Sequence, residues 1–412
     1  MLLNKINQSE KKGEEFFGKN EKVSKEILEK NLNNLSYIDN YSKFPISTNN
    51  DIDYYELGDK AFPVMLDELK KAEKFIFFEY FIVSHGTMWD SILEILEEKA
   101  KSGVDVRVIY DDLGCLPTLD GSYYKELRKK GIKALPFNKL GVDAGVIMNH
   151  RDHRKILVID GKVAFSGGIN IADEYININS KFGHWKDNAI RIKGSSVWNY
   201  TVMFLEIWNA YKKDDDDFTK FKYNYEKDND FKGYVVPYGE NPFNKENIAE
   251  NIYLNIISSA KKYIYIFTPY LIIDTDVLNN LILAAKRGVD VRIVIPGIPD
   301  KKMVYTVSES YVDPLVKGGV KIYKYTPGFV HSKVFVSDDH IATVGTINMD
   351  YRSLYLHFEC GCYMEDVKVV ENIKNDLMST MEKSHEVKRE ETNTKFVKSL
   401  WQACLRLVAP LM

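Results

Sequence analysis

The chain has 412 residues, more than a single hydrophobic core usually serves, so we expect two domains or one duplicated unit. Its composition of 45% hydrophobic, 13% aromatic and 28% charged residues is that of an ordinary globular protein and does not suggest a fibrous or disordered chain. The net charge is only −3, without the broad positive field expected of a dedicated duplex-DNA-binding protein. No nucleic-acid partner is therefore expected.

The first residues and the cysteines show which membrane, metal and disulfide features are not expected. Residues 1–45 form a polar N-terminal segment that is too polar for a signal peptide, and no run in the chain reaches about 18 apolar residues. We therefore expect no transmembrane segment. Neither a zinc site nor a disulfide framework is predicted, because no CxxC spacing or histidine cluster accompanies the four cysteines, Cys115, Cys360, Cys362 and Cys404.

The first half of the chain, residues 46–230, has an alternating pattern of strands and helices. A β-branched and aromatic run at 74–83 predicts a buried strand, and apolar residues at helical spacing follow at 89–103. A second strand is predicted where VDVRV begins at 104, and a third at 129–137 after a helix stop. The order is strand, helix, strand, helix, strand.

The second half, residues 231–385, repeats this order with strands predicted at 262–272, 289–295 and 317–325. The seam is expected within 212–233, where four consecutive aspartates indicate a solvated loop more than a metal site. Residues 386–412 form an amphipathic C-terminal tail. We predict an α/β protein with two homologous halves, each a mixed β-sheet flanked by helices, packed about a pseudo-twofold axis.

One motif occurs in both halves, HRKILVID at 153–160 and HSKVFVSD at 331–338. Each copy is followed by a Gly-x-x-Asn element, GGIN at 167–170 and GTIN at 345–348. Structural histidines have no reason to recur with the same companions in register, so the pattern favours function. The candidate catalytic and phosphate-binding residues are His153, Lys155, Asp160 and Asn170 in the first copy and His331, Lys333, Asp338 and Asn348 in the second.

The histidine and lysine of each motif share one face of an extended strand, because residues two apart point the same way. The aspartate falls on the opposite face, which indicates a structural or supporting charge. If the two motifs meet, one histidine can attack a phosphodiester while the other protonates the leaving alcohol. The lysines and asparagines would bind the non-bridging oxygens. Two ammonium groups then replace a metal ion, so no metal or cofactor is expected.

A nucleophilic imidazole needs an acceptor for its other ring N–H. Two carboxylates lie in strand-like stretches downstream of the motifs, Asp187 in FGHWKDNAIRI and Glu359 in LYLHFEC. We predict them as supporting partners of the histidines. The alternative is that each is a surface charge on an edge strand.

The paired motifs and their flanks resemble the phospholipase D superfamily, and within it the bacterial cardiolipin synthase branch. The matching flanks run from about residue 45 to the C-terminus and include NHRDHRKILVIDGKVAFSGGINIADEY, RGVDVRIVIPGIPDKKMVY and PGFVHSKVFVSDDHIATVGTINMDYRS. The resemblance implies phosphatidyl transfer through a phosphohistidine, which joins two phosphatidylglycerol molecules into cardiolipin and releases glycerol. It also implies His153 as the nucleophile and His331 as the general acid and base, an order that the residues alone do not give.

The resemblance places the protein at the cell membrane, on the cytoplasmic face or peripherally. Synthases of this branch usually begin with two hydrophobic spans, and here the chain begins in the polar stretch that normally follows them. The tail at 395–408 offers a second route to a membrane surface, with Val397, Leu400, Trp401, Cys404 and Val408 along one helical face. A helix that closes the core is the alternative for this segment.

Three other functions share parts of this pattern. A phospholipase D hydrolase would use the same intermediate and give it to water. A nuclease of the superfamily would share the site but is expected to be shorter or more basic. A non-catalytic lipid-binding relative would have no need of an intact histidine and lysine in both copies.

Overall fold

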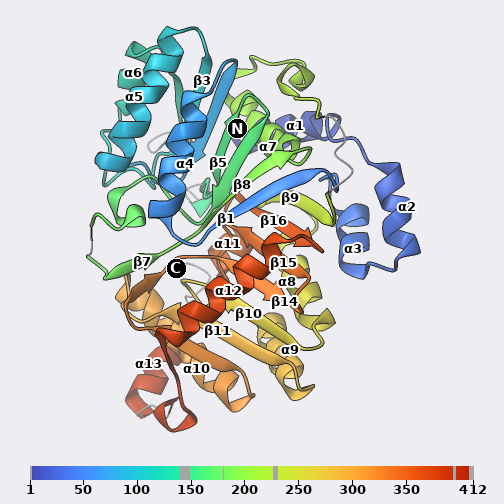
Figure 1. The fold of residues 1–412 in the computed structure, drawn as a ribbon. Coiled ribbons are helices and arrows are strands. Elements are labelled where there is room, and N and C mark those ends of the chain that lie inside the picture. Colours follow the sequence, from blue (N-terminus) through green and yellow to red (C-terminus); the bar gives the residue numbers. More distant parts are fainter. Residues whose placement is uncertain (1, 140–148, 180, 226–230, 393–395, 408–412) are drawn as a thin grey trace.

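The computed structural model describes residues 2–139, 149–179, 181–225, 231–392 and 396–407. Two mixed β-sheets, of seven and eight strands, form the two halves of the molecule (Figure 1). The first sheet draws all its strands from 50–194 and the second from 234–386, so the halves divide between 194 and 234. The predicted α/β architecture of two similar halves is confirmed.

The strands of the first sheet lie in the order β1-β8-β6-β5-β2-β3-β4. They are β1 (Asn50–Tyr55), β2 (Phe75–Tyr80), β3 (Asp105–Asp111), β4 (Lys133–Phe137), β5 (Lys155–Ile159), β6 (Val163–Gly167) and β8 (Ala189–Gly194). Strands β2, β3 and β4 run parallel to one another, and the remaining pairs are antiparallel. The sheet is therefore mixed, as predicted.

The second sheet repeats this order as β9-β16-β15-β14-β10-β11-β12 and adds β17 beyond β12. Its strands are β9 (Tyr234–Glu240), β10 (Tyr263–Phe267), β11 (Asp290–Pro296), β12 (Lys321–Tyr325), β14 (Val334–Ser337), β15 (Ile341–Gly345), β16 (Glu359–Glu365) and β17 (Ser384–Glu386). The motif strands β5 and β14 thus hold equivalent central places, and each pairs antiparallel with both of its neighbours.

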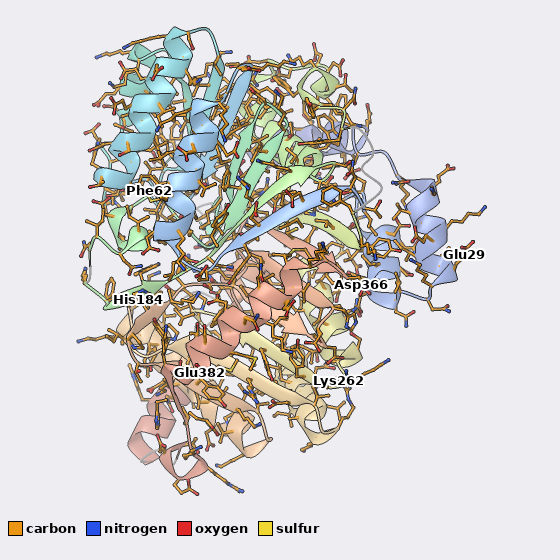
Figure 2. All side chains as sticks on the ribbon, viewed as in Figure 1. Glu29, Phe62, His184, Lys262, Asp366 and Glu382 are labelled. Carbon is orange, nitrogen blue, oxygen red and sulfur yellow. The ribbon has the colours of Figure 1, made fainter. Side chains whose placement is uncertain are left out.

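A third, two-stranded sheet joins the halves. It pairs β7 (His184–Lys186) of the first half in parallel with β13 (Gly328–Val330) of the second. His184, labelled in Figure 2, marks this junction beside the second half. Strand β13 leads directly to His331, and an isolated bridge pairs Asp152, the residue before His153, with Phe358 of the second half. Both motifs are therefore held at the interface.

Helices cover the outer faces of both sheets and also lie between the halves (Figure 1). Helix α7, nearly all of it buried, packs between the first sheet and β9, while α12 packs on the second sheet and β1. The helices are α4 (Gly58–Lys70), α5 (Thr87–Lys101), α6 (Tyr123–Lys129), α7 (Val197–Lys212), α8 (Ile248–Ser259), α9 (Thr275–Lys286), α10 (Lys302–Lys317), α11 (Tyr351–Tyr355) and α12 (Val369–Glu382), with 3₁₀ turns at Asp173–Ile176, Phe218–Phe221 and Arg389–Thr392.

The N-terminal segment is more structured than its polar composition suggests. It forms α1 (Leu2–Glu14), α2 (Glu21–Glu29) and α3 (Asn33–Tyr41), which pack against α7 and α8. Several of its apolar residues lie on the inner faces and are buried, among them Ile6, Val23, Ile27, Leu35 and Ile38, whereas Leu28 and Tyr41 are exposed. The segment is therefore part of the folded core.

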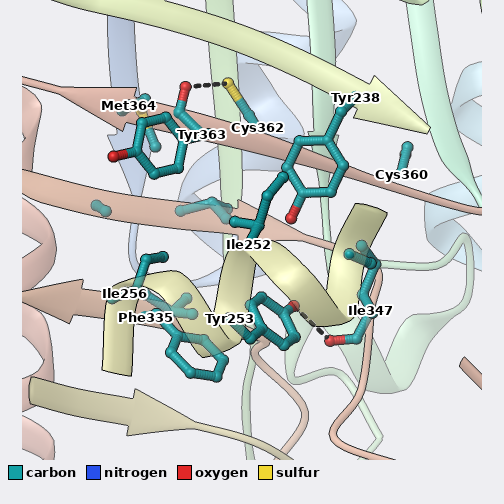
Figure 3. Packing of buried hydrophobic residues seen from close by; sticks show 14 of the residues in the cluster. Tyr238, Ile252, Tyr253, Ile256, Phe335, Ile347, Cys360, Cys362, Tyr363 and Met364 are labelled. Carbon is teal, nitrogen blue, oxygen red and sulfur yellow. Dashed lines mark hydrogen bonds between the residues drawn. The ribbon is translucent and has the colours of Figure 1, made fainter. Parts of the chain in front are cut away.

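The core of the second half supports the loop that carries GTIN (Figure 3). The ring of Tyr253 on α8 stacks on Phe335 of the motif strand, with centroids 4.1 Å apart. Its hydroxyl donates to the backbone carbonyl of Ile347 at 3.1 Å. Cys360 and Cys362 lie in the same core, buried as free thiols. Packing in this region fixes the position of Asn348, the next residue in the loop.

Helix α13 (Phe396–Leu407) packs on α10 through one side only. Leu405 is buried, and the guanidinium of Arg406 donates to Ser310. Trp401 and Leu407 remain exposed on the surface. The membrane-facing residues predicted from the sequence are thus described only in part, since Val408 and the side chains of Val397 and Leu400 lie outside the described residues.

Candidate active site

The two motif histidines are anchored by the backbone of the opposite half. The amide of His153 donates to the carbonyl of Phe358 at 2.9 Å, and the amide of His331 donates to the carbonyl of Lys186 at 2.7 Å. Phe358 and Lys186 each immediately precede a predicted carboxylate. The backbone pairing therefore delivers each carboxylate to the histidine of the other half.

The side chains form two crossed pairs. Nδ1 of His153 lies 2.9 and 3.0 Å from the carboxylate oxygens of Glu359, and Nδ1 of His331 lies 2.6 Å from Oδ2 of Asp187. With Nδ1 donating to the carboxylate, the lone pair resides on Nε2. The sequence predicted these four residues as partners but not the exchange between halves. Neither half contains a complete pair.

Burial keeps both imidazoles neutral. It lowers the pKa of His331 to about 4, with the charge of Lys333 acting in the same direction. Burial likewise lowers the pKa of His153 well below its usual value, and the neighbouring Lys155 adds to the shift. A neutral imidazole with one free nitrogen is the form that can attack phosphorus.

The two carboxylates differ in charge. Burial raises the pKa of Glu359 well above its usual value, although Lys155 opposes the shift. Burial also opposes ionisation of Asp187, but His331 and Lys333 together lower the pKa of that carboxyl. Asp187 is therefore more strongly ionised than Glu359. An ionised carboxylate favours the protonated form of the histidine beside it, so this effect is stronger at His331 than at His153.

The motif lysines lie beside their own histidines. Nζ of Lys155 donates to the backbone carbonyl of His153 at 2.6 Å, and Nζ of Lys333 donates to that of His331. Both lysines are almost fully buried, and burial lowers the pKa of Lys155 to about 8 and that of Lys333 to about 7. An incoming phosphodiester would supply the negative charge that these ammonium groups lack.

The motif aspartates lie away from the histidines. Asp160 follows β5 at a positive φ of 54° and accepts the backbone N–H groups of Glu73, Lys74 and Phe75. Asp338 has the same conformation after β14 and accepts those of residues 261–263. Each aspartate thus holds the start of a neighbouring strand. These contacts support the structural interpretation and give the aspartates no contact with the reacting groups.

The two asparagines are not equivalent. Oδ1 of Asn170 accepts the N–H of Ile82 at 3.1 Å, and its Nδ2 donates to Tyr175 at 2.7 Å. One amide hydrogen is left for a phosphate oxygen. Asn348 hydrogen-bonds the carboxyl of Asp350, but its Oδ1 is buried without a partner in the part of the chain that the structure describes. The predicted phosphate-binding role stays a prediction for both.

The sequence alone did not identify Thr346 as a residue that distinguishes the two histidine–carboxylate pairs. The hydroxyl of Thr346 donates to Glu359, whereas the equivalent position in the first half is Gly168. A Cβ at Gly168 would lie 2.0 Å from Oδ1 of Asp187, so only glycine fits there. The difference between GGIN and GTIN was visible in the sequence, but its meaning depends on which acid each loop contacts.

A third histidine, His357, also lies at the site. Together with His153 and Glu359 it forms a group whose possible metal-ligand atoms all lie within 4.8 Å of one another. The repeated pattern of the sequence does not mark His357, because this histidine occurs in one half only. Its counterpart two residues before Asp187 is Trp185.

The fold and this interface define a two-domain phospholipase D-like enzyme, in which paired histidine and lysine motifs face each other. A family model described as a cardiolipin synthase, phospholipase D-like domain, matches residues 65–208 and 253–381. The chain belongs to the cardiolipin synthase family.

Curated relatives cover most of the chain. It is 36% identical to a cardiolipin synthase of Alkalihalophilus pseudofirmus over 375 residues, which are 90% of this chain and 74% of that protein. It is 36% identical to cardiolipin synthase 2 of Bacillus cereus over 86% of this chain and 69% of that protein. An uncharacterized protein of Streptococcus mutans is 46% identical over 94% of this chain and 84% of its own length. The chain is thus a phosphatidyltransferase by family.

A solved structure has the same fold. The phosphatidylserine synthase of Haemophilus influenzae superposes with a TM-score of 0.68 over 88% of this chain and 95% of that chain, at 14% identity. At this identity the likeness concerns the fold alone. In the described residues, none of the helices combines the length and the apolar character needed to cross a membrane.

Proposed function

We propose that the protein is a cardiolipin synthase that transfers a phosphatidyl group from one phosphatidylglycerol to a hydroxyl of another through a phosphohistidine. The observation that carries the proposal is the crossed arrangement of two imidazoles, His153 with Glu359 and His331 with Asp187, beside two buried lysines. The family supports the choice of lipid substrate.

In the first step Nε2 of His153 forms a bond to phosphorus, and the bond from phosphorus to the glycerol oxygen breaks. His331, which takes up a proton at Nε2 from solvent as the anionic lipid binds, gives that proton to the oxygen, so glycerol leaves as a neutral alcohol. The anionic phosphodiester raises the pKa of the imidazoles as it binds, and the ionised Asp187 favours the cationic form at His331. This asymmetry supports His331 as the acid.

In the second step His331 removes the proton from a hydroxyl of the second phosphatidylglycerol. That oxygen attacks phosphorus and releases His153, which gives cardiolipin and returns both imidazoles to their starting states. Lys155 and Lys333 stabilise the charge on the non-bridging oxygens in both steps. Neither of the two steps requires a metal ion or another cofactor.

The expected partner is a membrane surface that contains phosphatidylglycerol, and the expected location is the cytoplasmic face of the cell membrane. The exposed Trp401 and Leu407 on α13 support this placement, because apolar side chains at an amphipathic surface can enter the interfacial layer. The relatives' names support a phospholipid substrate.

The test is incubation of the purified protein with phosphatidylglycerol vesicles and mass spectrometry of the products. Equal amounts of cardiolipin and glycerol are expected, whereas phosphatidic acid as the main product would replace the synthase with a hydrolase. His153→Ala and His331→Ala should each lose at least roughly 100-fold in rate. His385→Ala is the matched control, since His385 is exposed and pairs with Glu391 away from the site.

The intermediate has its own test. Alkaline quenching preserves a phosphohistidine, so peptide mass spectrometry of the protein mixed with phosphatidylglycerol should find a phosphatidyl adduct on His153. An adduct on His331 would reverse the two roles. Normal turnover in both histidine variants would refute the mechanism.

A further inference from the structure

His357 is a polar group that the proposed mechanism does not use. Its ring lies 5.7 Å from that of His153, and its Nδ1 lies 3.8 Å from Oε1 of Glu359. Its side chain is 9% exposed, as are those of His153 and His331. Neither ring nitrogen has a hydrogen-bond partner among the residues that the structure describes.

The pseudo-twofold symmetry of the site breaks at this residue. His357 stands two residues before Glu359, and Trp185 stands two residues before Asp187 with its ring 5.5 Å from that of His331. An indole offers one N–H donor, whereas a neutral imidazole offers one donor and one acceptor. Nε1 of Trp185 is also buried without a partner among the described residues, so the His331 side offers a donor only, whereas the His153 side offers a donor and an acceptor.

A buried imidazole with two unpaired nitrogens is costly, and such groups normally have a partner when the protein works. A metal ion is a poor partner here. Burial lowers the pKa of His357 well below its usual value, and the positive charges of Arg352, Lys155 and Arg151 act in the same direction. Those charges would repel a divalent cation. A raised pKa also makes Glu359 a weak ligand.

A hydroxyl group fits the observed chemistry better, because it too donates one hydrogen bond and accepts another. The glycerol headgroup of phosphatidylglycerol has two hydroxyls close to the reacting phosphorus. We propose that His357 binds a hydroxyl of this headgroup and so selects donor lipids with a polyol headgroup over lipids whose headgroup has no hydroxyl. The proposal rests on the proposed function and identifies His357 as the residue that recognises the headgroup of the substrate.

The test compares phosphatidylglycerol with phosphatidylpropanol, which has a headgroup of the same carbon number without hydroxyls. Release of each headgroup is measured for the wild type, His357→Leu and His357→Asn in a single turnover with enzyme in excess, which needs no acceptor hydroxyl and gives the kcat/KM of the first step. The ratio of kcat/KM for the two lipids should fall at least roughly 10-fold in His357→Leu, since one or two hydrogen bonds are lost. His357→Asn keeps a donor and an acceptor and should recover part of the ratio. His385→Leu is the matched control and should leave it unchanged.

An equal fall for both lipids would assign His357 to folding or to catalysis and overturn the proposal, as would an unchanged ratio. Zinc bound at one equivalent to the wild type and absent from His357→Leu, measured by elemental analysis, would replace the hydroxyl with a metal ion.

A second measurement separates this proposal from the proposed function. Calorimetry with the soluble headgroup glycerophosphoglycerol should show binding to the wild type at least roughly 5-fold tighter than binding of glycerophosphopropanol. The preference should disappear in His357→Leu even if the wild type proves to be a hydrolase. Equal affinity of the wild type for both compounds would overturn the role of His357 while leaving a synthase reaction intact.

Discussion

Replacement of Asp160 by asparagine separates the structural part of the repeated motif from its chemistry. Oδ1 of Asp160 accepts the N–H groups of Lys74 and Phe75 at 2.7 and 2.9 Å, and Oδ2 accepts that of Glu73 at 2.9 Å. Asparagine tolerates the positive φ of 54° at this position, so the backbone is not strained. The substitution changes only the hydrogen bonding.

The magnitude follows from those three bonds. An amide keeps one acceptor oxygen for two of them, and its NH₂ group faces the third N–H. One hydrogen bond to a charged group is lost, worth about 1.5–3 kcal/mol, and the other two weaken by about 1 kcal/mol each as the acceptor becomes neutral. Because Glu73 and Lys74 are exposed, water recovers part of this loss at their N–H groups. We expect Asp160→Asn to lower the free energy of unfolding by about 2–4 kcal/mol.

The assay is urea unfolding followed by circular dichroism, combined with the rate of phosphatidyl transfer at a temperature where the variant is folded. Asp160→Asn should retain kcat within about 3-fold, because its carboxylate contacts neither histidine. His153→Asn is the reciprocal control, with stability nearly unchanged and activity lost. A 100-fold fall in kcat for folded Asp160→Asn would refute the structural assignment.

Four further outcomes are expected. Asp187→Asn should lower kcat at least roughly 100-fold, because it removes the negative charge that favours protonated His331 in the other half; an unaffected rate would rule out the crossed pairing. The kcat/KM for anionic lipid should fall as pH rises through about 7 to 8, where Lys333 and Lys155 lose their protons, and a flat profile from pH 6 to 9 would contradict this. Lys333→Met should be inactive but more stable than the wild type by up to about 4 kcal/mol at pH 7, because folding lowers the pKa of Lys333 from 10.5 to about 7. Urea unfolding should show that this gain in stability shrinks as the pH approaches 10. Gly168→Ala should lower kcat roughly 10-fold or more while the melting temperature changes little, since the new Cβ displaces the Asp187 carboxylate.

Much of the fold was predictable because local signals and the repeat agree. The buried strand expected at 74–83 is β2, and the one expected at 262–272 is β10. Their β-branched and aromatic residues favour strands, and their places in the two sheets are equivalent. The N-terminal helices were not predicted, because their few buried residues are spaced within polar sequence and gain stability only from packing on α7 and α8.

The sequence predicted which residues form the candidate site but not which of them pair with one another. Duplication pointed to His153 and His331, and strand context pointed to Asp187 and Glu359. Which carboxylate meets which histidine depends on backbone pairing across 206 residues for His153 and Glu359 and 144 residues for His331 and Asp187, for which the sequence carries no local signal. His357 escaped notice for the opposite reason, since a single histidine without a counterpart has no repeat to mark it.

Because each carboxylate contacts the histidine of the other half, a chain in which only one half has folded has an incomplete site. A half that folds first during synthesis presents an imidazole and a lysine but no carboxylate to orient the ring. Under the proposed mechanism, a nascent chain with only one folded half lacks a complete site and should not cleave lipids near it. Docking of the two halves would then complete the site, and we expect catalytic activity to report that docking.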